Sequence, residues 1–183
     1  MKARIRDALL AAYRNRKRKQ NNNSPAHALK TVRALLKQAN YGFYVSQGDD
    51  GWCSSRYVQP IVEWDKEQLQ IWVGTSATSR KVAETAQDNK VVIAFGNDKA
   101  GAHVVVYASA AVSTDIALCQ RYWQPAWKLF FPQGPESGEM AMLALTPERI
   151  EVIDLKHNIA PDPFCLKSLV MTWGDGCWQV SAA

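Results

Sequence analysis

The chain has 183 residues, 47% of them hydrophobic, a length that suits one domain with its own hydrophobic core. No apolar run approaches the roughly 20 residues of a membrane-spanning helix, which excludes a helical integral membrane protein. The four cysteines form no CxxC pair and no histidine lies at ligand spacing from them, so neither a disulfide scaffold nor a zinc site is expected. We therefore expect a cytoplasmic protein whose cysteines are reduced and buried as small hydrophobic residues.

The net charge of +5 is concentrated near the N-terminus. Residues 2–19 hold eight Lys or Arg against one Asp, so the remainder is close to neutral. Residues 4–19 are expected to form a helix with Ile5, Leu9, Leu10 and Tyr13 on one face. The basic cluster 14–19 is either a solvated helix end or a contact for nucleic acid or an anionic membrane. An Arg-rich transit peptide is the remaining alternative for this segment.

Hydrophobic periodicity and turn residues predict the elements that follow. A second helix is expected at 27–38, before a change to strand periodicity at Tyr41. The remaining predicted elements, in order, are strands 41–46, 56–64 and 69–74, helix 79–87, strands 91–95 and 104–113, helix 115–129, a hairpin of 140–145 with 150–155 around Thr146-Pro147-Glu148, and a last hairpin around Asp175-Gly176.

This order predicts a mainly β fold, in which about six antiparallel strands close into a small barrel with flanking helices and so leave no exposed edges. The expected organisation is an N-terminal helical extension over residues 1–40, the barrel over 41–155, and a C-terminal hairpin that packs on the barrel over 156–183.

The segment from Gly74 to Lys81 carries the clearest chemical signal. Four hydroxyl side chains and two cations follow a strand and open a helix. The start of a helix attracts anions because its first N–H groups are unpaired and the helix dipole is positive there. Arg80 can bind a phosphate through two hydrogen bonds, and Lys81 can add a point charge. The alternative is that Thr78 or Ser79 merely caps the helix while both cations face solvent.

A further basic residue, Arg56, begins the preceding strand, and the hairpin that follows can bring it near the start of the helix. Pro60 cannot donate to a β ladder, so the chain just before it is expected to lie at an edge or bulge where a flat ligand can contact exposed backbone.

These residues resemble a known family. The string Ser54-Ser55-Arg56-Tyr57-Val58 resembles the SSRxV motif of pyridoxamine 5'-phosphate oxidases. Thr75 with Ser79-Arg80-Lys81 is similar to their T-x-x-x-S-R-K segment at matching spacing. The motifs Tyr122-Trp123-Gln124-Pro125 and Phe130-Phe131-Pro132-Gln133-Gly134-Pro135 resemble the general-stress-protein branch of this superfamily. The resemblance covers residues 41–155.

The resemblance implies an FMN-binding split barrel that works as a homodimer, with the flavin between the subunits. The residues that it assigns to the cofactor are Arg56, Tyr57, Val58, Gln59, Gly74, Thr75, Ser79, Arg80, Lys81 and His103. The first Arg, the Thr and the Arg-Lys pair would hold the phosphate and the ribityl chain. Val58 and Gln59 would border the ring, and His103 would approach it from the partner subunit or stay a structural residue.

Two departures from the oxidase pattern bear on the reaction. Ile61 stands where the oxidases have a Lys, and their C-terminal substrate motif has no counterpart here. Oxidation of pyridoxamine phosphate is therefore not expected, and no catalytic side chain or metal ligand is assigned. The expected function is flavin-dependent redox of a small or planar substrate. The alternatives are a non-catalytic FMN-binding stress protein and a haem-handling member of the same barrel.

Overall fold

The computed structural model describes residues 2–162 and 164–182. The helices are α1 (Lys2–Gln20), α2 (Pro25–Gln38), α3 (Arg80–Gln87) and α4 (Ile116–Tyr122), with short 3-10 helices η1 (Asp98–Ala100) and η2 (Pro125–Leu129). The strands are β1 (Gly42–Gln47), β2 (Cys53–Val58), β3 (Pro60–Asp65), β4 (Gln68–Ser76), β5 (Lys90–Asn97), β6 (Ala102–Ser113), β7 (Met140–Asp154), β8 (Leu169–Gly174) and β9 (Cys177–Ala182).

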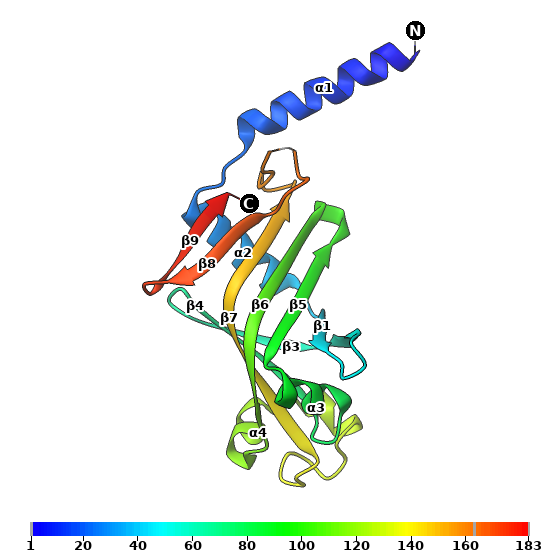
Figure 1. The fold of residues 1–183 in the computed structure, drawn as a ribbon, viewed down its shortest axis with the longest axis vertical. Helices are drawn as coiled ribbons and strands as arrows, with labels where there is room; N and C mark the ends of the chain where they lie inside the picture. Colours follow the sequence, from blue (N-terminus) through cyan, green and yellow to red (C-terminus); the bar gives the residue numbers. More distant parts are fainter. Residues whose placement is uncertain (1, 163, 183) are drawn as a thin grey trace.

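All nine strands belong to one antiparallel sheet, whose main path runs β2-β1-β5-β6-β7-β4-β3 (Figure 1). The long strand β7 joins its two parts: residues 140–145 pair with β4, whereas residues 149–152 pair with β8. The end strands β2 and β3 are consecutive in the chain and separated by Gln59 alone. Within the described residues they do not pair, so the barrel is split at this point.

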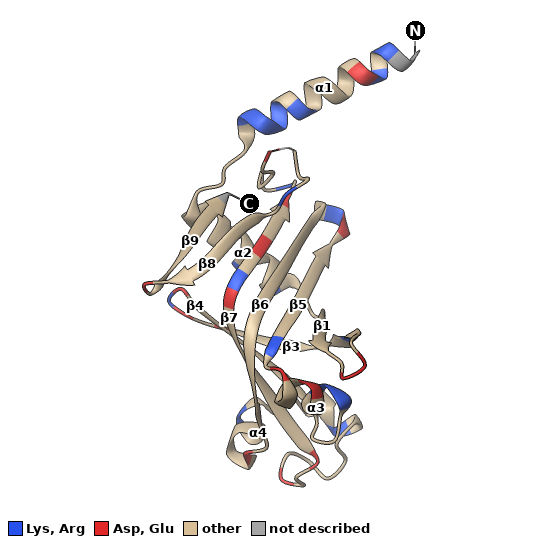
Figure 2. Ribbon diagram, viewed as in Figure 1, with Lys and Arg blue, Asp and Glu red and all other residues tan. Residues whose placement is uncertain are grey.

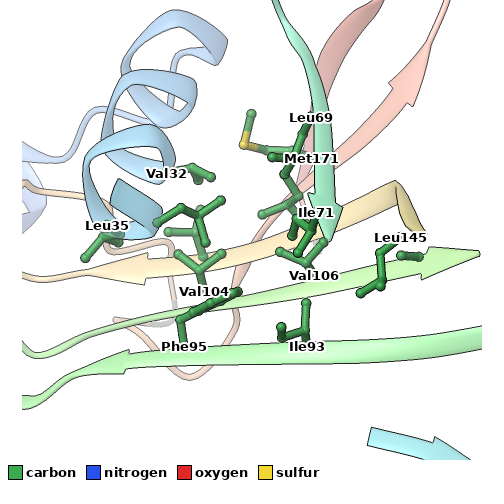
Figure 3. Close-up of a cluster of buried hydrophobic side chains, with 14 of the residues drawn as sticks. Val32, Leu35, Leu69, Ile71, Ile93, Phe95, Val104, Val106, Leu145 and Met171 are labelled. Carbon is green, nitrogen blue, oxygen red and sulfur yellow. The ribbon is translucent and has the colours of Figure 1, made fainter. Parts of the chain in front are cut away.

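The main core lies between α2 and the sheet (Figure 3). Val32 and Leu35 of α2 point toward Phe95 of β5 and Val104 of β6. Ala28 and Leu36 of the same helix are also buried, because the apolar residues of α2 recur with a helical period and form one stripe. The second helix therefore forms part of the barrel core.

A second, smaller hydrophobic core lies at the end of the molecule that contains α4. Its buried residues are Cys119, Tyr122, Trp127, Phe131, Met140 and Met142. They come from α4, η2, the loop after η2 and the start of β7. This cluster fixes the aromatic segment around η2 against β4 and β7.

The predicted mainly β architecture with flanking helices is confirmed. Within the described residues the sheet has nine strands, because the C-terminal hairpin β8–β9 joins it, and it is not closed. The predicted strand 56–64 is two strands, because Gln59 breaks the pairing before Pro60. The predicted hairpin around Thr146-Pro147-Glu148 is wrong. Residues 140–154 form one strand, and Pro147 lies at a register shift opposite Ala108, where a missing N–H is tolerated.

The predicted helix 115–129 is interrupted. Helix α4 ends at Tyr122, and η2 starts at Pro125. Gln124 is extended because the following proline disfavours the helical conformation for the residue before it.

The last hairpin follows the prediction from its turn residues. Asp175 and Gly176 both have positive φ angles of 52° and 77° and connect β8 to β9. A two-residue Asp-Gly turn with this geometry matches the twist of the strands on either side.

The expectation that the cysteines are buried is correct for Cys119 alone. Cys53 and Cys177 are exposed, and Cys165 is partly buried.

Helix α1 extends from one end of the molecule, while α3 and α4 lie at the other end of its longest axis (Figure 1). Its cations form the largest concentration of blue in Figure 2. Within the part of the chain that is described, no helix combines the length and apolar character needed to cross a membrane.

Candidate functional site

A pocket of about 460 Å³ opens where the split between β2 and β3 meets the start of α3. Its lining residues are Tyr41, Tyr57, Val58, Gln59, Gly74, Thr75, Ser76, Lys81, Trp127, Phe130 and Phe131. The volume lies within the range of small-molecule and cofactor sites, and most of the wall is aromatic or aliphatic. The aromatic part of the wall is therefore suited to a flat apolar ring, and Thr75, Ser76 and Lys81 supply polar groups to the same pocket.

The polar side is built from the end of β4 and the first turn of α3. Lys81 donates a hydrogen bond from its Nζ to the Thr75 hydroxyl at 2.7 Å. The Ser79 hydroxyl lies 3.2 Å from the same oxygen and does not cap α3. The first amide groups of a helix have no partner within the helix, so this end presents N–H groups, two hydroxyls and a cation to one volume.

A buried ion cluster lies directly behind this polar wall. The Glu84 carboxylate, only 6% exposed, pairs with Arg56 at 2.6 Å and with Arg80 at 3.1 Å. Ser46 and Ser54 donate hydrogen bonds to the same carboxylate at 2.6 and 2.9 Å. The cluster thus ties α3 to strands β1 and β2 through one buried anion.

The surroundings shift the pKa values of Glu84 and Lys81. Burial by itself would raise the pKa of Glu84, but hydrogen bonds from Ser46 and Arg56 outweigh it and hold the pKa below its ordinary value. Partial burial, with a smaller contribution from the charge of Arg56, lowers the pKa of Lys81. Glu84 therefore stays ionised at neutral pH and anchors the guanidinium groups beside it.

The charge balance at this end suits a phosphate ester. Arg56, Arg80 and Lys81 contribute three positive charges, and Glu84 removes one. A phosphate monoester carries about −1.5 to −2 at pH 7. The residual charge of +2 thus matches the group that the resemblance implies.

Trp127, Phe130 and Phe131 form an aromatic wall of the pocket. Gly74 allows Trp127 of this wall to approach β4 closely. A Cβ atom at this position would lie 2.5 Å from Cη2 of Trp127 and 2.9 Å from Cε of Met140. Both distances are shorter than real contacts, so glycine is what lets the Trp127 ring pack against the strand beside the polar wall.

Six of the residues expected from the sequence line the pocket: Tyr57, Val58, Gln59, Gly74, Thr75 and Lys81. Ser79 lies just behind Thr75, and Arg56 and Arg80 contact Glu84 beside the pocket. His103 is exposed at the far end of the β5–β6 hairpin, where it pairs with Gly96. A single chain therefore does not bring His103 to this pocket, and its approach from a partner subunit stays a prediction.

The other histidines lie away from the pocket. The His27 ring contacts the His157 carbonyl at 2.7 Å, and the His157 ring pairs with Asp154. The residues that line the described pocket include no histidine, so the structure offers no support for the haem alternative.

Sequence reasoning missed Glu84 and did not assign the aromatic wall to the cofactor. Glu84 could have been found from its position four residues after Arg80, which places the two side chains on one helix face. No local pattern indicates that Trp127 meets Gly74, because that contact joins elements about fifty residues apart in the sequence.

Solved structures share this fold at low sequence identity. A Clostridium acetobutylicum protein related to general stress protein 26 of Bacillus subtilis matches with a TM-score of 0.65 and 17% identity, over 79% of this chain and 93% of that one. A pyridoxamine 5'-phosphate oxidase-related, FMN-binding protein from Nostoc punctiforme matches with a TM-score of 0.63 and 18% identity, over 86% and 93%. General stress protein 26 of Bacillus anthracis matches with 0.58 and 17%, over 69% and 94%.

None of the curated proteins matches this sequence. The family model described as pyridoxamine 5'-phosphate oxidase like matches residues 27–167, which include most of α2, the main path of the sheet and every residue that lines the pocket. The resemblance found from the motifs is thereby confirmed, and this chain belongs to the pyridoxamine 5'-phosphate oxidase-like family.

Proposed function

We propose that the chain binds FMN in this pocket and uses it to oxidise or reduce a small or planar substrate. The observation that carries the proposal is the pairing of two complementary walls in one cavity of about 460 Å³. The polar wall holds Lys81, Thr75 and the start of α3, and Trp127, Phe130 and Phe131 form an aromatic wall of the same cavity. A molecule with a phosphate at one end and a flat ring at the other satisfies both walls.

Each part of the pocket has a separate role toward such a cofactor. Lys81 and the hydroxyls beside it hold the phosphate, and Glu84 keeps Arg56 and Arg80 close by. The ring lies against the aromatic wall and the backbone near Gln59, which belongs to neither β2 nor β3. The flavin supplies the redox chemistry when bound, and the protein binds and orients it.

A homodimer is part of this proposal. Tyr41, Phe43 and Tyr57 form a stacked and tilted aromatic group on β1, β2 and the residue before β1, and each is about half exposed or more. Tyr41 and Tyr57 also line the pocket. A second subunit that covers this group would bury it and complete the pocket wall. Light scattering on the purified protein tests the dimer directly, and a monomer with and without FMN would contradict it.

Titration with FMN and with riboflavin tests the cofactor assignment. The two ligands share the ring and differ in the phosphate. A charge-assisted hydrogen bond contributes about 1.5–3 kcal/mol, so Lys81→Ala should weaken FMN at least tenfold and riboflavin much less. Arg80→Ala should act in the same direction with a smaller effect, because its side chain is 74% exposed. Lys90→Ala, which removes an exposed lysine paired with Glu148, is the control.

The outcomes separate the parts of the proposal. Equal weakening of FMN and riboflavin by Lys81→Ala would overturn the phosphate assignment. Failure of the unaltered protein to bind either ligand would overturn the cofactor itself. Absorbance and fluorescence quenching of the flavin give both affinities.

A non-catalytic FMN-binding protein is the second candidate. The observation that favours it is that the titratable groups lining the described pocket are Tyr41, Tyr57 and Lys81, with no carboxylate, histidine or thiol among them. Anaerobic reduction of the bound flavin by NADH or NADPH distinguishes the two functions. Reduction followed by reoxidation with an added acceptor supports an oxidoreductase, whereas a tightly bound flavin that neither donor reduces supports the second candidate.

A further inference from the structure

Helix α1 lies outside the residues that the family model matches. The Tyr13 ring packs edge-on against Phe164, and the Arg14 guanidinium lies over the same ring. The C-terminal part of α1 is fixed to the body. Lys17 donates hydrogen bonds to the Leu155 carbonyl and to Asn158, and Arg18 pairs with Asp162. The N-terminal part extends away from the sheet (Figure 1). The contacts of Lys17 and Arg18 therefore fix the end of α1 to the domain and leave its N-terminal part, which we call the free segment, in solvent.

The free segment carries an apolar stripe. Ile5, Ala8, Leu9 and Ala12 follow the spacing i, i+3, i+4 and i+7, which places them on one helix face. Tyr13 continues this face but already packs against Phe164. Successive residues of a helix are about 100° apart, so Leu10 lies off this stripe although the sequence alone grouped it with Leu9. Leu9 is 67% exposed and Leu10 57%, so neither finds a partner large enough to bury it among the described residues.

Cations flank the stripe on both sides. Residues 2–6 hold three Lys or Arg, and residues 14–19 hold five. With Asp7 the whole helix carries +7, so the rest of the chain carries −2. Figure 2 shows this separation along the ribbon. An apolar stripe between cationic ends combines the two attractions of a helix that lies in the surface of an anionic membrane.

Other occupants fit less well. A nucleic acid would neutralise the cations but would leave Ile5 and Leu9 in water, because phosphate contacts bury no apolar stripe. A second copy of α1 would place two helices of charge +7 side by side. Anionic lipid satisfies both the charge and the stripe.

We propose that α1 docks this protein onto anionic lipid bilayers. Ile5 and Leu9 enter the boundary between headgroups and acyl chains, and the flanking cations contact the lipid phosphates and carboxylates. Because α1 and α3 lie at opposite ends of the longest axis, the pocket stays away from the bilayer and open to the solvent. The proposal does not depend on what the pocket binds.

Sedimentation of the full-length protein with vesicles tests the proposal. The vesicles are phosphatidylcholine alone and phosphatidylcholine with phosphatidylserine, at near-physiological salt. Binding is expected for the mixed vesicles only. Leu9→Ser should weaken it about fivefold, because a leucine that enters the bilayer surface loses its apolar burial. Leu10→Ser is the matched control, since it removes the same side chain one residue away and costs the same helix propensity.

Two further measurements complete the test. Arg16→Gln and Lys19→Gln remove cations for which the structure describes no contact with the barrel, and each should weaken vesicle binding about fivefold. Equal effects of Leu9→Ser and Leu10→Ser would overturn insertion of the stripe. Absence of vesicle binding, together with salt-dependent binding of duplex DNA that Leu9→Ser leaves unchanged, would assign α1 to nucleic acid instead. Circular dichroism checks that each variant keeps its helix.

Discussion

Both ends of this molecule carry arginine and lysine side chains, but those at the α3 end include a largely buried arginine and those at the α1 end are mostly exposed. At the α3 end, Arg56 is only 17% exposed and is held by the buried Glu84. At the α1 end, the arginines and lysines of residues 4–19 are exposed apart from the partly buried Lys17, and the ion pair of Arg18 with Asp162 lies on the surface. A buried charge needs a partner to be stable at all, whereas an exposed one is already satisfied by water.

This difference separates two kinds of recognition. The α3 end is a fixed pocket wall, because each member of its ion cluster is positioned by the others. The α1 end presents charge density without a fixed geometry for any one ligand, which suits a surface made of many similar anions. The variants below test whether the two ends differ as strongly as their burial indicates.

The largest loss of stability is expected for Glu84→Ala. Removing the carboxylate leaves the Arg56 guanidinium without its anion in a largely buried place, which should lower the free energy of unfolding by about 3 kcal/mol. Glu148→Ala is the matched control, because that carboxylate pairs with Lys90 while 54% exposed, and should cost less than about 1 kcal/mol. Urea unfolding measures both, and similar costs for the two glutamates would contradict the contrast.

A smaller loss is expected for Gly74→Ala. The added Cβ would meet the Trp127 ring at 2.5 Å, so the ring must move, at a cost of about 2 kcal/mol. Gly96→Ala is the matched control in strand β5, because a Cβ there meets nothing within 4 Å. Thermal unfolding, together with the FMN titration, compares them. A stable Gly74→Ala protein with unchanged flavin affinity would show that the aromatic wall is not fixed.

The loss of stability at acid pH should depend in part on the protonation of Glu84. Its folded-state pKa lies below the ordinary value of 4.5, so the unfolded state binds more protons as the pH falls through this range. The stability that Glu84 contributes is therefore present above that value and is lost as the pH falls through the folded-state pKa. Glu84→Gln should be less stable than the unaltered protein at neutral pH and approach it in acid. Parallel curves would contradict this assignment.

The smallest effect is expected at the α1 end. Arg18→Ala removes an exposed ion pair with Asp162, and the change in unfolding free energy should be close to the limit of detection and vanish at high salt. Calorimetry at low and high salt measures it. A large loss that persists at high salt would mean that α1 is part of the cooperative fold.

The strand–helix junction that we propose binds phosphate could be predicted directly from the sequence. Thr75, Ser79 and Lys81 are close in the chain, and the unpaired amides of a helix start are a local property. The last hairpin was equally predictable, because the Asp175-Gly176 turn needs two residues that tolerate positive φ angles. Both predictions rest on interactions within a few residues.

The sequence-based prediction of a turn at Pro147 was wrong because a proline fits more than one kind of local structure, and only the tertiary structure decides between them. Pro147 was expected in a turn, but it lies inside a long strand because β6 continues past it on the neighbouring side. The missing N–H of a proline is acceptable in either place.

By itself, the sequence determined the family, the mainly β fold with its flanking helices, and the cationic and hydroxyl groups at the start of α3. These follow from periodicity, turn chemistry and ordered motifs, all of which act over short stretches of chain. Only the tertiary structure decided that Glu84 is buried between Arg56 and Arg80, and that Trp127 packs against Gly74 to close one side of the pocket. Burial and close approach are properties of the packed molecule, because they depend on which distant segments share a volume.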